Sequence, residues 1–530
     1  MLFNSYIFIF VFLPLVVGIY ALVRKLENRS WSIGLLVIAS LFYYSWWKPE
    51  FLTLLIFSVT VNYFLGKYLI NKNIKPNLSK IILICGIIFN IALLFYFKYT
   101  MFFMKNINDL FGADLSIPQI ILPIGISFIT FQKIAFLVDA HIGRVGNFSF
   151  KNYALFVTFF PQLIAGPIVH HSEMMPQFDK KPSTNHFHND LSIGVSIFII
   201  GLFKKVVIAD SVSVYADAGY GTIKSGLPLD FVSSWITVIS YSLQLYFDFS
   251  GYSDMAVGIA RIFGIRLPVN FHSPYKSESI IEFWRRWHMT LSRFLRDYIY
   301  IPLGGNRVGS FRQTLNITLV MLIGGLWHGA NWTFVLWGGI HGVMLTFNHG
   351  WNQTSFSKWK FFDSKIMKII FVFLTFILVS LAWIPFRAES ISDALKMFNY
   401  LFIPGNFDII KISLLNFINA QTAIFYDLKD IALWFKPREL WPSPLPADFI
   451  SSQKPVAVIL FLALLITFIF PNTHQYFGIF QPVSGLSSYQ LIHRGTILAL
   501  NKKIAFLISA IFVFSILQLS RVRPFLYFQF

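Results

Sequence analysis

The chain has 530 residues, of which 56% are hydrophobic and only 13% charged, and phenylalanine alone contributes 61. Soluble domains carry about 25% charged residues, so this composition excludes an ordinary soluble protein and predicts a polytopic membrane protein. The net charge of +19 then indicates basic loops beside anionic lipid headgroups, because the sequence shows no motif for binding nucleic acid.

Apolar segments recur along the whole chain and predict an all-α bundle of roughly eleven to thirteen membrane-spanning helices in one domain. Helix breakers at 122–127 and 159–167 lie within apolar stretches and predict re-entrant segments. The apolar cores of the expected spans are residues 6–23, 31–47, 51–70, 81–99, 121–138, 193–209, 231–247, 314–327, 332–347, 369–384, 456–470 and 504–517.

The first span has no Lys or Arg before Arg24 and a basic run from Arg24 to Arg29 directly after it. A cleavable signal carries its positive charge before the apolar stretch, so we expect an uncleaved first span with the N-terminus outside. The lone Cys85 allows neither an internal disulfide nor a zinc site of sulfur ligands.

Three stretches of the domain are expected to differ in role: N-terminal helices at 1–110, a catalytic core at 118–350 and C-terminal helices at 351–530. Two regions are predicted not to span the membrane. Residues 266–313 are rich in arginine, and residues 404–452 form a proline-rich polar connection.

Two histidines stand out in this apolar chain. His288 ends the run Phe283-Trp284-Arg285-Arg286-Trp287-His288, and His328 follows Leu326-Trp327 and precedes Gly329. An ionisable side chain inside a membrane protein is costly and marks a functional site by default. We therefore take His288 and His328 as candidate catalytic residues.

Residues 280–299 fit one amphipathic helix at the membrane–water boundary, started by Ser277 or Ser279 with Glu282 as a capping-box partner. His288 lies near the edge of the apolar stripe and should point inward, either toward a reaction or only toward structural partners. The opposite, basic face either holds the helix against anionic lipid or binds a phosphate-bearing donor. Its arginines are Arg285, Arg286, Arg293 and Arg296.

His328 closes a buried helix at 314–327 whose glycines allow close backbone approach. Burial disfavours the imidazolium form, so His328 is expected to be neutral, as a general base must be. A helix-packing hydrogen bond is the alternative, and His341 is its nearest rival. We add three neighbours of the two histidines as candidate donor-binding residues: Trp287, Trp327 and Asn331.

The segment 246–254 places Asp248, Tyr252 and Asp254 directly after an apolar run. Buried acids need partners, and a structural polar network with Arg261 or Arg266 is favoured over direct chemistry. No sequence pattern of metal ligands is present, so no metal is expected, and His170-His171 is interpreted as a bystander.

These segments together resemble the membrane-bound O-acyltransferase family, in particular its bacterial alginate O-acetylation branch. The motifs that carry the resemblance fall in order over most of the chain. They are 122–128 with Phe131-Gln132, 160–168, 246–254, Asn270-Phe271 with Ser273-Pro274-Tyr275, 283–288 with Leu291-Ser292, 296–305, Leu326-Trp327-His328-Gly329, Pro385-Phe386-Arg387-Ala388 and 525–530.

The resemblance implies a ring of helices with a thin centre, a funnel open to the cytoplasm and a tunnel toward the other side. It makes His328 the catalytic histidine and places His288 in the same tunnel. With no cofactor bound, the expected donor is acetyl-CoA or another acyl thioester, including a carrier-bound one. The expected acceptor is an envelope polysaccharide, reached directly or through a periplasmic partner protein, and the expected location is the bacterial inner membrane.

Several functions remain open at this point. Within acyl transfer, the acceptor is an exopolysaccharide such as alginate, or peptidoglycan, or teichoic acid that receives D-alanine. A proton-coupled transporter or channel is the alternative of another class, although such folds often contain inverted repeats that this sequence lacks. A non-catalytic envelope scaffold would tolerate loss of both histidines.

Overall fold

In a computed structural model of the chain, helices and loops make up the fold. The predicted connection at 404–452 lies almost wholly outside the described residues. Among the described residues, the one β contact is an isolated bridge between Pro268 and Ser484. The expected all-helical fold class is confirmed. The structure describes residues 1–179, 187–402, 411, 414–415, 418, 456–485, 501–519 and 523–526.

The chain forms two compact units. Unit 1 comprises Met1–Ile199, Tyr252–Asn270 and Thr473–Leu498, and unit 2 comprises Ile200–Gly251, Phe271–Asn472 and Ala499–Phe530. Two helices, α10 (Phe187–Phe203) and α12 (Phe231–Ile262), contribute residues to both units.

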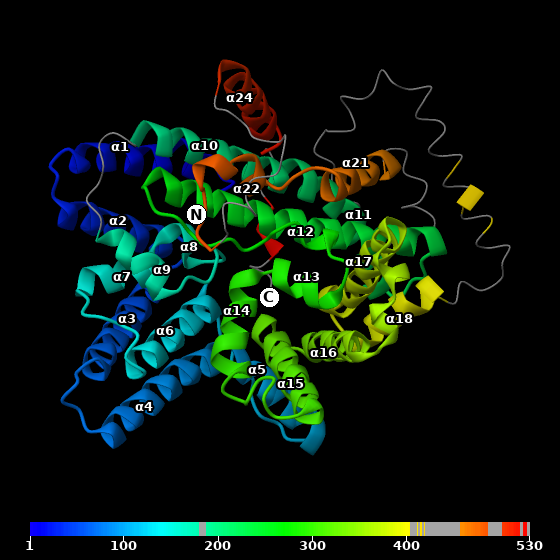
Figure 1. Cartoon of the computed structure of the whole chain (residues 1–530), viewed down its shortest axis with the longest axis horizontal. Coiled ribbons are helices and arrows are strands. Elements are labelled where there is room, and N and C mark those ends of the chain that lie inside the picture. Colours follow the sequence, from blue (N-terminus) through cyan, green and yellow to red (C-terminus); the bar gives the residue numbers. More distant parts are fainter. Residues whose placement is uncertain are drawn as a thin grey trace. The chain divides into compact units, whose positions relative to one another are not determined.

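Unit 1 contains the N-terminal helices, among which α3, α4 and α6 lie side by side (Figure 1). Asn62 on α3 and Asn90 on α4 are both fully buried and exchange amide hydrogen bonds of 2.7 and 3.3 Å. Such pairs join helices where lipid supplies no hydrogen-bond partner. The described helices that lie wholly in this unit are α1 (Leu13–Arg24), α2 (Arg29–Ser45), α3 (Glu50–Leu69), α4 (Pro76–Leu94), α5 (Thr100–Phe111), α6 (Ile126–His141), α7 (Phe150–Thr158), α8 (Phe160–Leu163), α9 (His171–Phe178) and α22 (Thr473–Tyr476).

Unit 2 carries both candidate histidines. Its helices α15 and α16 form a tightly packed hairpin, and α17 packs against α16 (Figure 1). Besides its part of α12, the unit contains α11 (Asp210–Lys224), α13 (Ile280–Arg286), α14 (Met289–Leu295), α15 (Ser310–His328), α16 (Trp332–Gln353), α17 (Lys365–Arg387), α18 (Ile391–Phe402), α21 (Val456–Phe468) and α24 (Lys502–Leu517).

Four helical stretches of the described chain are long and apolar enough to cross a membrane: Glu50–Leu69, Pro76–Phe111, Phe187–Lys224 and Lys365–Arg387. Phe8–Arg24 and Val456–Phe468 are shorter apolar helices. The protein is therefore a membrane protein with several apolar helices, while the larger number of spans and the central funnel stay predictions.

Many large apolar side chains lie on outward helix faces. Ile88, Phe373 and Phe506 are 60, 63 and 77% exposed, and each belongs to an apolar helix. Exposed apolar side chains in such number are unfavourable in water, and a bilayer is the solvent that removes the cost.

Both predicted breaks in apolar segments are present. Residues 122–125 are not helical, and Gly125 takes a left-handed conformation (φ 75°) directly before α6. Residues 159–169 contain only the one-turn α8 and are buried throughout, so their irregular backbone is packed inside protein. This is the condition under which such backbone is tolerated at membrane depth.

One helix is much longer than the sequence indicated. We expected the segment 246–254 to follow a span at 231–247, but α12 runs without a break over 32 residues to Ile262. The polar residues therefore project from a helix and not from a loop. Gly251 is the weakest helix former among them, but a glycine inside a helix costs only about 1 kcal/mol, so it does not end the helix.

Candidate active site

His288 lies at a break between two short helices. α13 ends at Arg286, Trp287 is extended, and His288 takes a left-handed conformation (φ 42°, ψ 51°) before α14 begins. The prediction of one amphipathic helix over 280–299 is thus wrong, although Ser279 does cap its start by accepting from the Glu282 amide. No Gly or Pro marks the break. A left-handed residue that is not glycine costs roughly 1–3 kcal/mol and is often found at functional sites.

The His288 ring is enclosed by aromatic side chains of unit 2 and is 1% exposed. The edge-on ring of Phe249 lies 4.9 Å away between centroids, and Trp327 lies 6.1 Å away. Burial lowers the pKa of His288 to about 3. The imidazole is therefore neutral over the physiological pH range.

This lowered pKa predicts a pH-dependent stability. Between pH 6.5 and 3, His288 is protonated in the unfolded chain but not in the folded chain. The stability present above pH 6.5 is therefore lost as the pH falls toward 3. Relative to His288→Asn, the wild type should lose about 1.4 kcal/mol per pH unit in that window. Unfolding of both proteins in detergent at pH 7, 6, 5 and 4 measures the difference. A constant difference would show that His288 takes up its proton in the folded state.

His328 is the last residue of α15 and is 6% exposed. Its ring packs against Trp337 at 5.1 Å and Phe386 at 5.2 Å between centroids. The rings of His328 and His288 are 6.4 Å apart. The end of α15 and the break between α13 and α14 thus bring the two predicted residues, forty positions apart in sequence, to neighbouring places.

Close packing of α15 on α16 fixes His328 in place. A Cβ atom at Gly338 would collide with the Met321 carbonyl oxygen, and one at Gly325 would collide with the Phe334 carbonyl oxygen. Gly325 lets the backbones approach as the sequence indicated, and Gly338 on α16 does the same from the other side.

Gly338 and Gly339 form a matched pair for testing this packing. Gly338→Ala should destabilise the protein by about 1–3 kcal/mol and reduce transfer, because α16 must move away from α15. Gly339→Ala should be tolerated or gain up to about 1 kcal/mol, because its nearest neighbour is Leu322 Cδ2 at 3.9 Å and alanine favours a helix. Thermal unfolding in detergent compares them, and equal midpoints would contradict the packing argument.

His341, the alternative candidate to His328, makes a structural contact. It is fully buried, and its Nδ1 accepts a hydrogen bond of 3.2 Å from the Trp284 indole. The Trp337 ring lies between it and His328, 4.9 Å from the first and 5.1 Å from the second. Trp337 is in turn stacked on Trp383 at 5.7 Å. His341 therefore supports the aromatic wall behind His328.

Asp248 has a partner that the sequence analysis missed. Lys205 Nζ lies 2.6 Å from Asp248 Oδ1 and 2.8 Å from Asp210 Oδ1, and both Lys205 and Asp248 are buried. The other Asp248 oxygen accepts from the Leu526 amide at 3.0 Å and so holds this residue in place. The signal was available, because a lysine inside the apolar stretch 193–209 requires a counter-ion.

Asp254 and Tyr252 belong to unit 1. Asp254 accepts a hydrogen bond of 2.6 Å from Thr473 and lies 3.3 Å from His474 Nε2. The Tyr252 ring stacks on Phe3 at 4.8 Å. The expectation that Arg261 or Arg266 would neutralise these acids is wrong.

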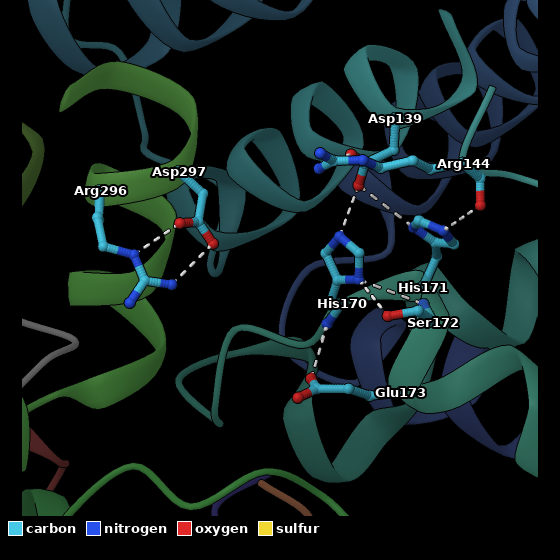
Figure 2. A network of polar contacts seen from close by, with 8 residues as sticks. All are labelled: Asp139, Arg144, His170, His171, Ser172, Glu173, Arg296 and Asp297. Atoms are coloured by element: carbon cyan, nitrogen blue, oxygen red, sulfur yellow. Dashed lines mark hydrogen bonds and ion pairs between the residues drawn. The ribbon is translucent and has the colours of Figure 1, made fainter. Parts of the chain in front are cut away.

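The four predicted donor-binding arginines divide into two kinds. Arg286 pairs with Glu282 at 2.5 Å. Arg296 pairs with its neighbour Asp297 at 2.7 Å, and this second pair is drawn in Figure 2. These carboxylates compete with any anionic ligand. Arg293 is half-buried, and the exposed Arg285 remains the strongest candidate of the set.

The remaining candidates adjoin the histidines in different ways. Trp327 and Trp287 are buried, with Trp327 4.9 Å from the His328 ring. Asn331 caps α16 by accepting from the Thr333 amide at 3.1 Å, and it donates to the Glu389 carbonyl at 3.1 Å. Its side chain is thus occupied in holding the loop after His328.

His170 and His171 form a network that sequence reasoning missed (Figure 2). His170 Nε2 lies 2.5 Å from Asp139 Oδ2, and His171 Nδ1 lies 3.5 Å from the same oxygen. The three residues have a geometry that could hold a metal ion. Arg144, 3.7 Å from the carboxylate, already supplies positive charge. The network joins α6 to α9 in unit 1, so the two histidines have structural partners that the sequence did not indicate.

Comparison with known proteins identifies related sequences. The profile of the membrane-bound O-acyltransferase family matches residues 41–386. A peptidoglycan O-acetyltransferase of Helicobacter pylori is 46% identical over 75% of this chain and 79% of its own. A probable alginate O-acetylase of Azotobacter vinelandii is 35% identical over the full length of both chains. A teichoic acid D-alanyltransferase of Bacillus subtilis is 28% identical over 50% of this chain and 69% of its own.

Proposed function

Because the chain belongs to the membrane-bound O-acyltransferase family, we propose that it moves an acetyl group from a cytoplasmic thioester to a hydroxyl of an envelope glycan. That the protein is an O-acyltransferase follows from family membership. The proposal adds the donor, the acceptor and the residues that act. The observation that carries it is the 6.4 Å separation of the buried His288 and His328 rings.

His328 is proposed as the general base. Its imidazole accepts the proton of the acceptor hydroxyl as that oxygen attacks the thioester carbonyl carbon. The carbon–sulfur bond then breaks, and the same proton passes from His328 to the departing thiolate. General-base assistance of this kind is worth about 10²–10⁴-fold in rate.

His288 is proposed to stabilise the oxyanion that forms on the carbonyl oxygen. A neutral imidazole keeps one N–H donor, and its low pKa of about 3 keeps it neutral throughout the reaction. Hydrogen-bond donors in a site closed to water stabilise developing negative charge more strongly than they do in water. The aromatic side chains around both histidines support this exclusion of water.

The donor is proposed to be acetyl-CoA, held partly by the exposed Arg285. Arg285→Gln should raise the apparent KM for acetyl-CoA severalfold with little change in kcat, because a phosphate contact is made equally in the ground and transition states. Arg307→Gln, which removes an exposed arginine from the loop after α14, is the matched control. Equal KM values for the two variants would mean that Arg285 does not bind the donor and contacts lipid headgroups instead.

The acceptor is proposed to be peptidoglycan, with a secreted polysaccharide as the second candidate. The 46% identity to a peptidoglycan O-acetyltransferase favours the first, and full-length similarity to probable alginate O-acetylases supports the second. In either case the protein would lie in the inner membrane with its N-terminus outside. A periplasmic partner protein would take the acetyl group onward.

Chemical analysis of the envelope tests the proposal. O-acetyl groups released by mild base are quantified separately from purified peptidoglycan and from secreted polysaccharide in a deletion strain and its complemented form. We expect loss from one polymer and restoration by the wild-type gene. Unchanged acetylation of both polymers would contradict the proposed function.

A further inference from the structure

Unit 1 contains a cavity of about 630 Å³ that lies entirely within that unit and is not part of the histidine site. Its polar wall has four arginines and one carboxylate, Asp190. The arginines come from three places: Arg24 and Arg29 flank the turn between α1 and α2, Arg261 is near the end of α12, and Arg266 follows it.

Two of these arginines are held in place by buried contacts. Arg24 is 6% exposed, and its guanidinium lies 4.6 Å from the centre of the Phe187 ring. Arg261 is 7% exposed and pairs with Asp190 at 2.8 Å. Rigid placement of this kind means that a ligand need not order the side chains itself.

Arg29 pairs with Asp179 at 3.3 Å and Arg261 pairs with Asp190, and both arginines still have donor capacity to spare. The Nε atoms of Arg29 and Arg261 are buried and have no hydrogen-bond partner among the described residues. Burial lowers the pKa of Arg261, Asp190 opposes the effect, and the adjacent Arg266 adds to the lowering. A bound anion would accept hydrogen bonds from these Nε donors and would reduce the repulsion between Arg261 and Arg266.

The other wall of the cavity is apolar. Ile33 and Leu36 come from α2, Leu155 from α7 and Ile193 from α10. The arginines lie at the ends of α1 and α12 and at the start of α2, and α1 is an apolar helix. Basic residues at the ends of apolar helices are placed at the depth of lipid headgroups.

We propose that this cavity is a binding site for a phosphate-headed amphiphile, an anionic phospholipid of the surrounding bilayer. The arginine forks bind the phosphate oxygens, and the apolar wall receives the first carbons of the acyl chains. The site is separate from acyl transfer, and its binding reaction needs neither donor nor acceptor.

Calorimetric titration of the purified full chain in a neutral detergent tests this site. The probes are short-chain phosphatidylglycerol, short-chain phosphatidylcholine, inorganic pyrophosphate and ADP. We expect saturable binding of phosphatidylglycerol that exceeds binding of the other three. Arg29→Gln with Arg266→Gln should weaken it at least tenfold, because one charge-assisted hydrogen bond is worth about that factor.

A charge-matched control is Lys72→Gln with Lys75→Gln, which removes two cations from an exposed turn between α3 and α4. It should leave binding unchanged, and thermal unfolding verifies that both double variants are folded. Equal binding by the two double variants, or no saturable binding by the wild type, would overturn the proposal. Equally tight binding of pyrophosphate or ADP would overturn the proposal of a phospholipid ligand and identify the ligand as a soluble phosphate.

Discussion

His328→Ala should abolish acetyl transfer, lowering the rate by about 10²–10⁴-fold while the protein remains folded and inserted. The hydroxyl proton then has no acceptor as the carbonyl is attacked, although donor binding persists. The measurement is transfer of label from radiolabelled acetyl-CoA to glycan in isolated membranes, normalised to the amount of protein.

His341→Gln is the matched comparison, because His341 is also a fully buried histidine of unit 2. Its loss breaks the contact with the Trp284 indole and should lower stability by about 1–3 kcal/mol. Transfer per folded molecule should survive. If His341→Gln instead lost transfer at full stability, or if His328→Ala retained it, the assignment of the base to His328 would be wrong.

Lys205→Met should be the most destabilising single change considered for this chain, at about 3–5 kcal/mol. It leaves the carboxylate of Asp248 buried without a cation, 2.6 Å from where the ammonium stood, and removes the partner of Asp210 as well. It also weakens the anchoring of Leu526, which donates to Asp248. The midpoint of thermal unfolding in detergent is the measurement.

Lys224→Met provides the control for this ion pair. Lys224 pairs with Glu389 at 2.8 Å, but both side chains are more than half exposed, so the loss should be at most about 1 kcal/mol. The double variant Lys205→Met with Asp248→Asn should recover part of the loss, because no unpaired charge remains at position 248. Additive losses in the double variant would mean that the two residues do not interact in the folded protein.

Composition and apolar patterning were enough to predict the fold class and most helices. The spans expected at 369–384 and 504–517 correspond to α17 and α24, because long apolar runs leave the backbone few alternatives to a helix. The two histidines were found for a related reason. Polar side chains are rare in such runs, so the few that occur identify the place where they act or are held.

Local signals failed where packing overrides propensity. Residues 280–299 fit the pattern of one amphipathic helix, and no glycine or proline occurs at the break at His288. The break accompanies the burial of Trp287 among aromatic rings, including Trp383 at 5.0 Å. Contacts of this kind join residues about a hundred positions apart, and no window of a single sequence contains them.

The partners of buried charged residues were also not predicted. Asp248 is paired with Lys205, and Asp139 with His170 and His171, at sequence separations of 31 to 43 residues. The residues that need a partner can be recognised from their apolar surroundings. Which partner each one takes depends on how the helices pack, and the sequence alone left that choice open.

In the proposed reaction the acetyl group crosses the membrane while its donor stays on the cytoplasmic side. Inside-out vesicles that enclose glycan and receive radiolabelled acetyl-CoA only from the bath test it directly. We predict label on the enclosed glycan with the wild type and none with His328→Ala. Label that appears only when donor and glycan share a compartment would show that the acetyl group does not cross the membrane in this protein.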